Sequence, residues 1–477
     1  MKTIKTLVIL FGIITFFSCE DQLVVVPEDS VEIETVFDTR GSINGAVVGI
    51  YSKNQSGDLN GNPQLISDFM ADDVNFVGSF TSLQEVDQFE TLATNTTIDN
   101  IWLDGYELIG AANNIIVNLP DVDLPDLSEE EKAQFIGEAK FLRAVTYFQL
   151  VNLFAQPFQF NGGTNLGVPL VLIPFSPEVD LSEFQLPRST VNEVHELIEL
   201  DLLDAIPVLP DASSQFRATN DAPRALLARL YLYREQWTEA ANLADQVIAA
   251  GRFSLAADYD FYDDNPGSSE NIFSVINTPT DGPQDESVPG SDEVYTNFYN
   301  AAPGGRGDAP FSSDLLTAFG FAVGDTITGD RRFDELSIAA TDAGGTATFF
   351  TTKYPDVVNN ASDGMVLRMA EMYLIRAEAN LRGGTSIGDT PLNDVNTVRN
   401  RAGLPNLGSV DLDAILLERR KEFCFEGLRR MDLLRNNRNL RPGGGPESAP
   451  GADKVIFPIV DDELTNNPNI TQNPGNF

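Results

Sequence analysis

Three acidic side chains could in principle do chemistry together. Glu418, Glu422 and Glu426 recur every four residues, so they share one face of a helix predicted over 411–435. Two carboxyl groups at a suitable separation can hydrolyse a glycosidic bond. The same segment also carries Arg419, Arg420, Arg429 and Arg430. Because acids and arginines at helical spacing commonly pair, we predict structural ion pairs here, with a carboxylate-based glycoside hydrolase as the alternative.

Histidine and cysteine chemistry is scarce in this chain. Its 477 residues include one histidine, His195, and two cysteines, Cys19 and Cys424. One histidine cannot form a multi-histidine zinc site, and a nucleophilic triad would have to use His195 itself. Since His195 lies among apolar residues of a predicted helix and Cys424 lies within EFCFEG, both are expected to be structural. We therefore predict no catalytic residue and a protein that is not an enzyme.

A cluster of acids and amides offers oxygen atoms of the kind that calcium binds. It consists of Asp258, Asp260, Asp263, Asp264, Asn265 and Glu270. The spacing of an EF-hand is absent, and dense acids are ordinary in a chain with 71 Asp+Glu against 31 Lys+Arg. We expect no cofactor and keep calcium as the alternative. The formal net charge of −40 also disfavours nucleic acid as a partner, because it repels phosphate.

The N-terminus has the features of an export signal. Two lysines, Lys2 and Lys5, precede the apolar run LVILFGIITFF, which is shorter than the ~20 residues that span a bilayer. Cys19 follows this run after Ser18, where a bacterial lipoprotein carries its acylated cysteine. We predict a lipoprotein signal peptide over 1–18 and lipidation of Cys19. The alternative is a spectator cysteine beside an ordinary cleavage site.

Helical periodicity dominates the chain outside one internal region. The predicted helices are 38–53, 97–118, 129–154, 190–206, 221–235, 237–250, 365–382, 389–400 and 411–435. Within 138–154 four polar residues form one narrow stripe, which we predict to face solvent: Arg143, Thr146, Gln149 and Asn152. The remaining faces are apolar and need neighbouring helices. Aromatic and alanine spacing over 225–249 is typical of a tetratricopeptide hairpin, in which small residues let two helices approach closely.

The fold predicted from these patterns is mainly α, a tetratricopeptide-like scaffold of about four helix hairpins. Residues 252–364 are rich in Pro, Gly, Asp and Asn, with strand-like runs at 271–276 and 346–354. We interpret them as a loop-rich, partly β insertion. The predicted organisation is an N-terminal region over 19–251 and a C-terminal region over 252–477, which contains the insertion and closing helices over 365–435.

Several blocks, in a fixed order, resemble the SusD/RagB family of outer-membrane nutrient-binding lipoproteins. In the first half they are IWLDGYELIGAANNII, FLRAVTYFQLVNLF and GVPLV. In the second half they are LRMAEMYLIRAEANLRGG, NTVRNRAGLP, DAILLERRKEFCFEGLRRMDLLR and FPIVDDELTNNPNITQNPG. The resemblance implies a lipid-anchored, surface-exposed outer-membrane protein. It also implies a SusC-like TonB-dependent transporter as partner, and capture of an oligosaccharide or other nutrient without its cleavage.

Aromatic side chains in polar loops are the candidates for ligand contact, because sugar-binding surfaces stack aromatic faces on pyranose rings. Loop 71–90 offers Phe76, Phe80 and Phe89, and loop 291–311 offers Tyr295, Phe298 and Tyr299. For each ring the alternative is packing within the protein. Trp102 and Trp237 open helical patterns and are expected in the core. A solenoid lipoprotein that binds peptide or protein remains an alternative to glycan capture.

Overall fold

The computed structural model describes residues 35–175, 179–212, 216–262, 268–278, 295–359 and 361–475. The predicted signal peptide and Cys19 lie outside these residues, as do Asp263, Asp264 and Asn265. Among the helices that are described, none is long and apolar enough to cross a membrane.

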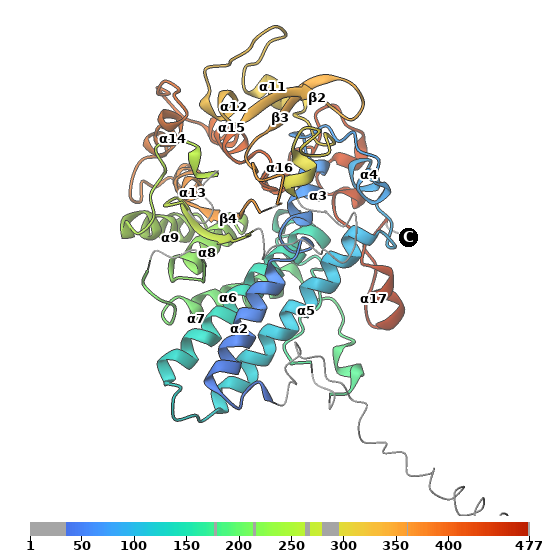
Figure 1. The fold of residues 1–477 in the computed structure, drawn as a ribbon, viewed down its shortest axis with the longest axis vertical. Helices are drawn as coiled ribbons and strands as arrows, with labels where there is room; N and C mark the ends of the chain where they lie inside the picture. Colours follow the sequence, from blue (N-terminus) through green and yellow to red (C-terminus); the bar gives the residue numbers. More distant parts are fainter. Residues whose placement is uncertain are drawn as a thin grey trace, which may run out of the picture.

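Helices make up most of the regular structure (Figure 1). In the N-terminal half they are α2 (Arg40–Asn54), α3 (Asn62–Met70), α4 (Thr81–Asp87), α5 (Thr96–Asn118), α6 (Glu129–Phe154), α7 (Val191–Ala205), α8 (Asp221–Tyr233) and α9 (Trp237–Ala250). In the C-terminal half they are α10 (Tyr295–Tyr299), α11 (Ser313–Ala318), α12 (Arg331–Asp334), α13 (Met369–Gly383), α14 (Pro391–Arg401), α15 (Leu412–Phe423), α16 (Arg429–Leu434) and α17 (Asp461–Asn466).

Within the described ranges, four short strands form two antiparallel pairs. Strand β1 (Asn271–Val275) pairs with β4 (Gly364–Arg368), and β2 (Ser337–Thr341) pairs with β3 (Ala347–Thr351). Both strand-like runs that the sequence indicated are therefore strands. The partly β character of the insertion agrees with this prediction.

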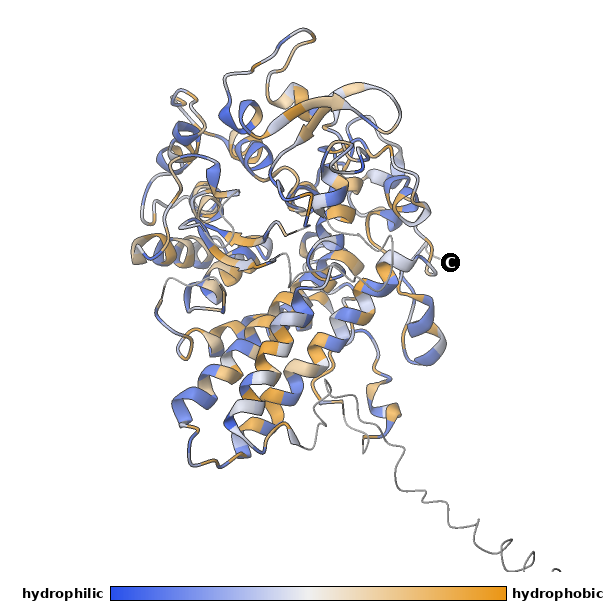
Figure 2. Cartoon of the chain, viewed as in Figure 1, coloured by the Kyte–Doolittle hydropathy of each residue, from blue (hydrophilic) through white to orange (hydrophobic). Residues whose placement is uncertain are grey.

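The scaffold consists of helices packed in pairs: α2 with α5, α6 with α7, α8 with α9, and α13 with α14. Figure 1 shows α2, α5, α6 and α7 running side by side in the lower half of the molecule. Figure 2 shows apolar and polar stretches alternating along them, as expected of amphipathic helices that pack laterally. The mainly α, hairpin-based fold predicted from the sequence is confirmed.

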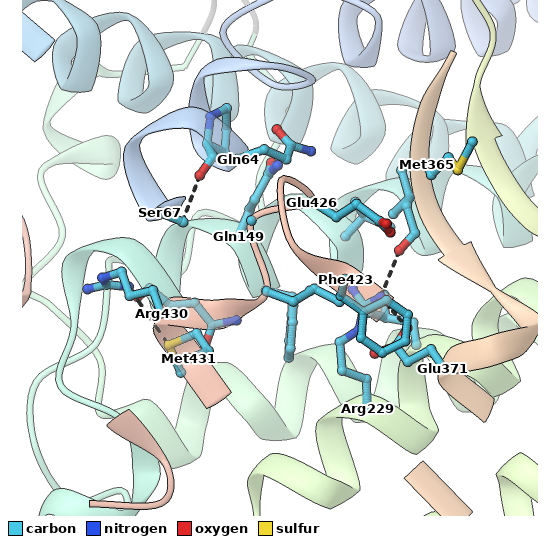
Figure 3. A pocket seen from close by; sticks show the side chains of 18 of the residues that line it. Gln64, Ser67, Gln149, Arg229, Met365, Glu371, Phe423, Glu426, Arg430 and Met431 are labelled. Carbon is cyan, nitrogen blue, oxygen red and sulfur yellow. Dashed lines mark hydrogen bonds and ion pairs between the residues drawn. The ribbon is translucent and has the colours of Figure 1, made fainter. Parts of the chain in front are cut away.

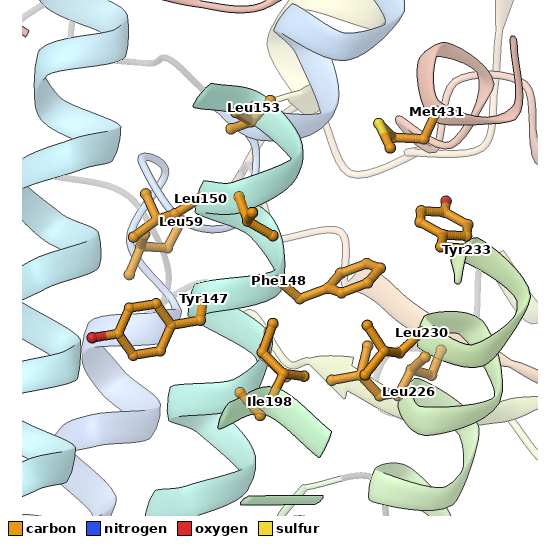
Figure 4. Close-up of a cluster of buried hydrophobic side chains, with 14 of the residues drawn as sticks. Leu59, Tyr147, Phe148, Leu150, Leu153, Ile198, Leu226, Leu230, Tyr233 and Met431 are labelled. Atoms are coloured by element: carbon orange, nitrogen blue, oxygen red, sulfur yellow. The ribbon is translucent and has the colours of Figure 1, made fainter. Parts of the chain in front are cut away.

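Small and aromatic residues explain the close packing of these pairs. Ala240, Ala241 and Ala244 of α9 are completely buried, because a methyl group lets the neighbouring helices approach. Between α6 and α8, Phe148 extends toward Tyr233, with ring centroids 5.4 Å apart (Figure 4). This contact joins α6 to α8 through apolar burial.

The polar stripe of α6 differs from the prediction of a wet face. Arg143 is buried and donates to both oxygens of Asp201 at 2.8 Å and to Asn113 at 2.6 Å. Thr146 is also buried and donates to the carbonyl of Leu142. Because α5 and α7 pack against α6, Arg143 makes its hydrogen bonds to those helices, whereas Thr146 bonds to the backbone of its own helix.

Some element boundaries also differ from the sequence prediction. Residues 365–368 belong to strand β4, and the predicted helix over 411–435 is two helices, interrupted at 424–428. Phe425 and Gly427 have φ values of 64° and 74°, which no right-handed helix accommodates.

The two tryptophans differ in burial. Trp102 is buried as expected, whereas Trp237 is half-buried under Arg382, whose guanidinium carbon lies 4.1 Å from the centroid of the Trp237 ring.

Candidate functional site

The acidic row, Glu418 and Glu422 of α15 and Glu426 of the following turn, lies in a buried network of ion pairs. Glu418 accepts from Arg332 at 2.6 Å, and Glu426 accepts from Lys353 at 2.6 Å. Glu422 is bonded by three arginines: Arg332, Arg368 and Arg401. All of these carboxylates are buried, so the predicted structural role is the one that the structure supports.

This electrostatic environment also bears on catalysis. Burial alone would raise the pKa of Glu422, but Arg401 and Arg368 outweigh it and hold that pKa below its ordinary value. Arg368 and Lys353 likewise lower the pKa of Glu426 against the effect of burial. A general acid of a glycosidase needs a raised pKa to carry its proton at neutral pH. The pKa values of Glu422 and Glu426 are lowered instead, so both side chains are ionised at neutral pH.

The other residues that could do chemistry are also buried structural residues. Burial lowers the pKa of His195 to about 3, so the ring is neutral, and burial raises the pKa of the Cys424 thiol to about 12. Glu270, from the predicted calcium cluster, is buried and accepts from Arg368 and Arg401. Within the described ranges, no group of three or more acidic, histidine or cysteine side chains is placed to hold a metal ion.

The structure brings together the two loops that the sequence singled out. The main chain of 74–77 runs against that of 308–311: Asn75 donates to Pro310 at 3.0 Å and Val77 donates to Asp308 at 2.8 Å. The C-terminal helices hold this junction, because Arg429 donates to both oxygens of Asp72 and Arg420 donates to Asp73. Segments that are distant in the chain therefore meet at one hydrogen-bonded junction.

Most of the candidate rings at this junction are packing residues. Phe76, Phe89, Phe298 and Tyr299 are 8%, 6%, 1% and 0% exposed, respectively. Phe76 stacks on Phe69 at 4.5 Å, and the Tyr299 hydroxyl donates to Asp68 at 2.6 Å. The expectation of ligand contact is corrected for these four, since their faces are already covered by protein. The side chain of Tyr295 lies outside the described part of the chain.

Phe80 is the candidate ring that keeps a partly exposed surface. Its ring lies edge-on to Phe298 at 5.6 Å, and the Arg306 guanidinium carbon lies 4.3 Å from its centroid. Arg306 is held in turn by a 2.7 Å bond from Nε to Asp308. The two terminal nitrogens of Arg306 donate to no residue that the structure describes, and its side chain is 31% exposed. We call Phe80 and Arg306 the loop platform.

Arg306 was missed as a site residue by the sequence. It lies in a Gly-rich loop within an Arg-Gly-Asp tripeptide, a pattern without specific chemical meaning. The partners that define its role, Phe80 and Phe298, come from other segments. Asp72 and Asp73, the acidic residues at the start of loop 71–90, are buried partners of arginines.

The described residues thus form a frame of paired helices, with buried carboxylates bound to arginines and a cation–aromatic pair at the surface. Two family models match the chain. One, described as starch-binding and associating with the outer membrane, matches residues 25–232, and the other, the SusD family, matches residues 346–475. Together they cover most of the chain, which therefore belongs to the SusD family.

Individual relatives agree over nearly the full length. A SusD-like protein of Formosa agariphila is 26% identical, over 98% of each chain. A crystal structure of a SusD superfamily protein from Bacteroides vulgatus has a TM-score of 0.79 and 25% identity, and covers 92% of this chain and 99% of its own. A laminarin-binding SusD-like protein has a TM-score of 0.73 and 26% identity, with coverage of 92% and 99%.

Proposed function

We propose that this protein captures an oligosaccharide at the cell surface and passes it, unaltered, to a SusC-like TonB-dependent transporter in the outer membrane. Membership of the SusD family supports carbohydrate binding, and one of its solved relatives is named for binding laminarin. In this proposal Cys19 carries the lipid that tethers the chain to the membrane.

The observation that carries the proposal is the loop platform. A sugar ring needs an apolar face to pack on and hydrogen-bond donors beside it. Phe80 offers apolar ring surface, and the terminal nitrogens of Arg306 offer donors in a planar fork. Ser79 and Thr81, on either side of Phe80, are exposed and add hydroxyl groups. The buried junction beneath holds these groups in place without a ligand.

The ion-paired carboxylates argue against the hydrolase alternative. Glu422 and Glu426 have lowered pKa values, so neither suits a general acid at neutral pH. Non-covalent capture needs no proton transfer. Release to the transporter then requires only that the complex dissociates, which moderate affinity permits.

Binding titrations of the soluble mature chain test this proposal. Laminarin and starch oligosaccharides serve as probes, with Phe80→Ala and Arg306→Ala as variants. We expect each variant to lose affinity at least tenfold, equivalent to about 1.4 kcal/mol. Phe160→Ala is the matched control, because Phe160 is an exposed ring (47%) between α6 and α7. Retention of peptides by the immobilised chain, with no glycan bound, would favour the peptide-binding alternative.

A further inference from the structure

Helix α10 positions both parts of the loop platform. The ring of Phe298, in this helix, meets Phe80 edge-on at 5.6 Å and lies 5.2 Å from the guanidinium carbon of Arg306. The main-chain amide of Arg306 donates to the carbonyl of Asn297, also in α10, at 2.9 Å. A shift of α10 would therefore move the support of the ring and the main chain of the arginine together.

A buried hydrogen bond attaches α10 to α3. Tyr299 donates from its hydroxyl to Oδ2 of Asp68 at 2.6 Å, and both residues are completely buried. The same oxygen accepts from the main-chain amide of Gly427 at 3.2 Å. The rings of Tyr354 and Phe425 pack against that of Tyr299, with centroids 5.6 and 5.3 Å away. Asp68 thus joins α10 to α3 and to the turn between α15 and α16. We call Asp68 and Tyr299 the α10 anchor.

The two oxygens of Asp68 have different surroundings. Oδ2 accepts two hydrogen bonds, whereas Oδ1 is buried and accepts none from the described residues. A buried carboxylate is stable only when donors satisfy its charge. A carboxylic acid needs fewer donors, because one of its oxygens carries a proton. The hydrogen bonds therefore suit a protonated Asp68 that accepts with Oδ2 and carries its proton on Oδ1.

In the described part of the chain, no cation forms an ion pair with Asp68. The titratable groups that face it come from α10, the loop after α3, the segment after β3 and the turn after α15: Tyr299, Asp73, Lys353 and Cys424. Lys353 donates to Glu426 at 2.6 Å. The nearby arginines of α15 and α16 donate to Asp73 and Asp72: Arg420 and Arg429. Because each cation already has an acidic partner, an ionised Asp68 would add a buried negative charge beside Asp73.

These surroundings make the α10 anchor depend on pH. Burial, together with the charge of Asp73, raises the pKa of Asp68 to about 8, whereas a carboxyl group in water has a pKa of ~3.9. The anchored arrangement therefore binds a proton that an opened arrangement releases. It loses stability relative to the opened arrangement as the pH rises from about 4 to about 8.

A cavity beside the α10 anchor gives water a place from which to reach it. Ser67, which precedes Asp68 in α3, lines this central cavity of about 110 Å³ together with Glu426 and Gly427 of the turn. Figure 3 shows Ser67 and Glu426 on its wall. One water needs only about 10–15 Å³ of such space. Water from the cavity can therefore hydrate the carboxylate once the contact between α3 and the turn opens.

We propose that Asp68 and Tyr299 are positioning residues, which hold α10 and the loop platform in place while Asp68 carries a proton and release them when that proton is lost. The inference rests on the proposed function in one respect, that the loop platform binds sugar. The platform is held, and binds more tightly, at mildly acidic pH, and it loosens as the pH rises. Since both residues are completely buried, they act on the ligand only through α10.

Hydrogen exchange of the mature chain without ligand tests the α10 anchor, read by mass spectrometry over residues 296–309 and corrected for the intrinsic effect of pH on exchange. From about pH 5.5 to about pH 7.5 the protection of this segment should fall at least ~10-fold, because one proton supplies up to about tenfold per pH unit. The comparison needs only the wild-type chain. Protection that does not change with pH overturns the proposal.

Variants assign the pH dependence to Asp68. Asp68→Asn keeps an oxygen that accepts from Tyr299 but cannot ionise, so its protection should be equal at the two pH values. Tyr299→Phe should lose protection at both. Asp204→Asn, which changes a 48% exposed acid on α7, is the matched control and should behave like the wild type. Thermal melts verify that each variant is folded. A pH dependence that persists in Asp68→Asn overturns the proposal.

Titration with laminarin oligosaccharides at the same two pH values connects the α10 anchor to binding. Wild-type affinity should be at least about threefold weaker at the higher pH, because part of the population is then released. Asp68→Asn should bind equally at both. Binding by the wild type that is independent of pH overturns the positioning role. If no oligosaccharide binds at either pH, the proposed function fails, while the exchange result still confirms or overturns the α10 anchor.

Discussion

Glu422 is the carboxylate on which the structural role of the acidic row depends most. It is completely buried beside three guanidinium groups, with Arg368 at 2.7 Å and Arg332 at 3.5 Å. Glu422→Gln keeps the size of the side chain but removes its charge, so these arginines lose a shared counter-ion. Removing one partner of a buried ion pair costs about 3–5 kcal/mol. We expect a loss of that size in the free energy of unfolding.

Urea denaturation at pH 7 measures this loss, and Glu335→Gln is its matched control. Glu335 pairs with Arg331, but their side chains are 40% and 35% exposed, and such surface pairs contribute about 0–1 kcal/mol. Equal, small losses in the two variants would refute the reasoning. So would a Glu422→Gln protein of normal stability that had lost an activity toward oligosaccharides, because that outcome identifies a catalytic carboxylate.

Three further predictions concern single side chains. Burial raises the pKa of Asp68 to about 8, so folding takes up a proton there, and the free energy of unfolding falls as the pH rises from 4 to 8. In urea titrations, Asp68→Asn should reduce this pH dependence. Asp432 is also buried, yet Arg419 and Arg435 lower its pKa to about 2. The ionised carboxylate therefore contributes fully to the free energy of unfolding above pH 4, and this contribution is lost as the pH falls toward 2. Asp432→Asn should remove this part of the acid unfolding. Cys19→Ala should move the protein from the membrane fraction to the soluble fraction after cell lysis, whereas Cys424→Ala should not.

Helices were predictable from the sequence because their signals are local. Ser128 caps α6 by accepting from the amide of Glu131, and Gly251 ends α9 with a φ of 65°. Such features need only neighbouring residues, and they placed most helices within a few positions. The break at Cys424 follows instead from the tertiary position of Gly427, where a side chain would meet the backbone of Gln64 at 2.7 Å.

The site was predictable only in part, because burial is decided by distant segments. An aromatic ring in a polar loop gives the same sequence pattern whether it faces ligand or packs inward. Phe80 and Phe298 differ only in how the two loops meet, and that depends on Asp72 and Asp73 being held by α15 and α16. The partners of Arg143 on α5 and α7 were hidden for the same reason, since the sequence pattern on α6 looked like a solvent-facing stripe.

The central claim is that the protein holds its ligand without changing it. Mass spectrometry of the bound oligosaccharide measures this directly: the mature chain is saturated with laminarin oligosaccharides of defined length, separated from free sugar after overnight incubation, and denatured to release what it holds. The account predicts recovery of the intact lengths, in an amount that falls sharply for Phe80→Ala. Shortened or chemically modified oligosaccharides, released by the wild-type chain but not by Glu422→Gln, would contradict it.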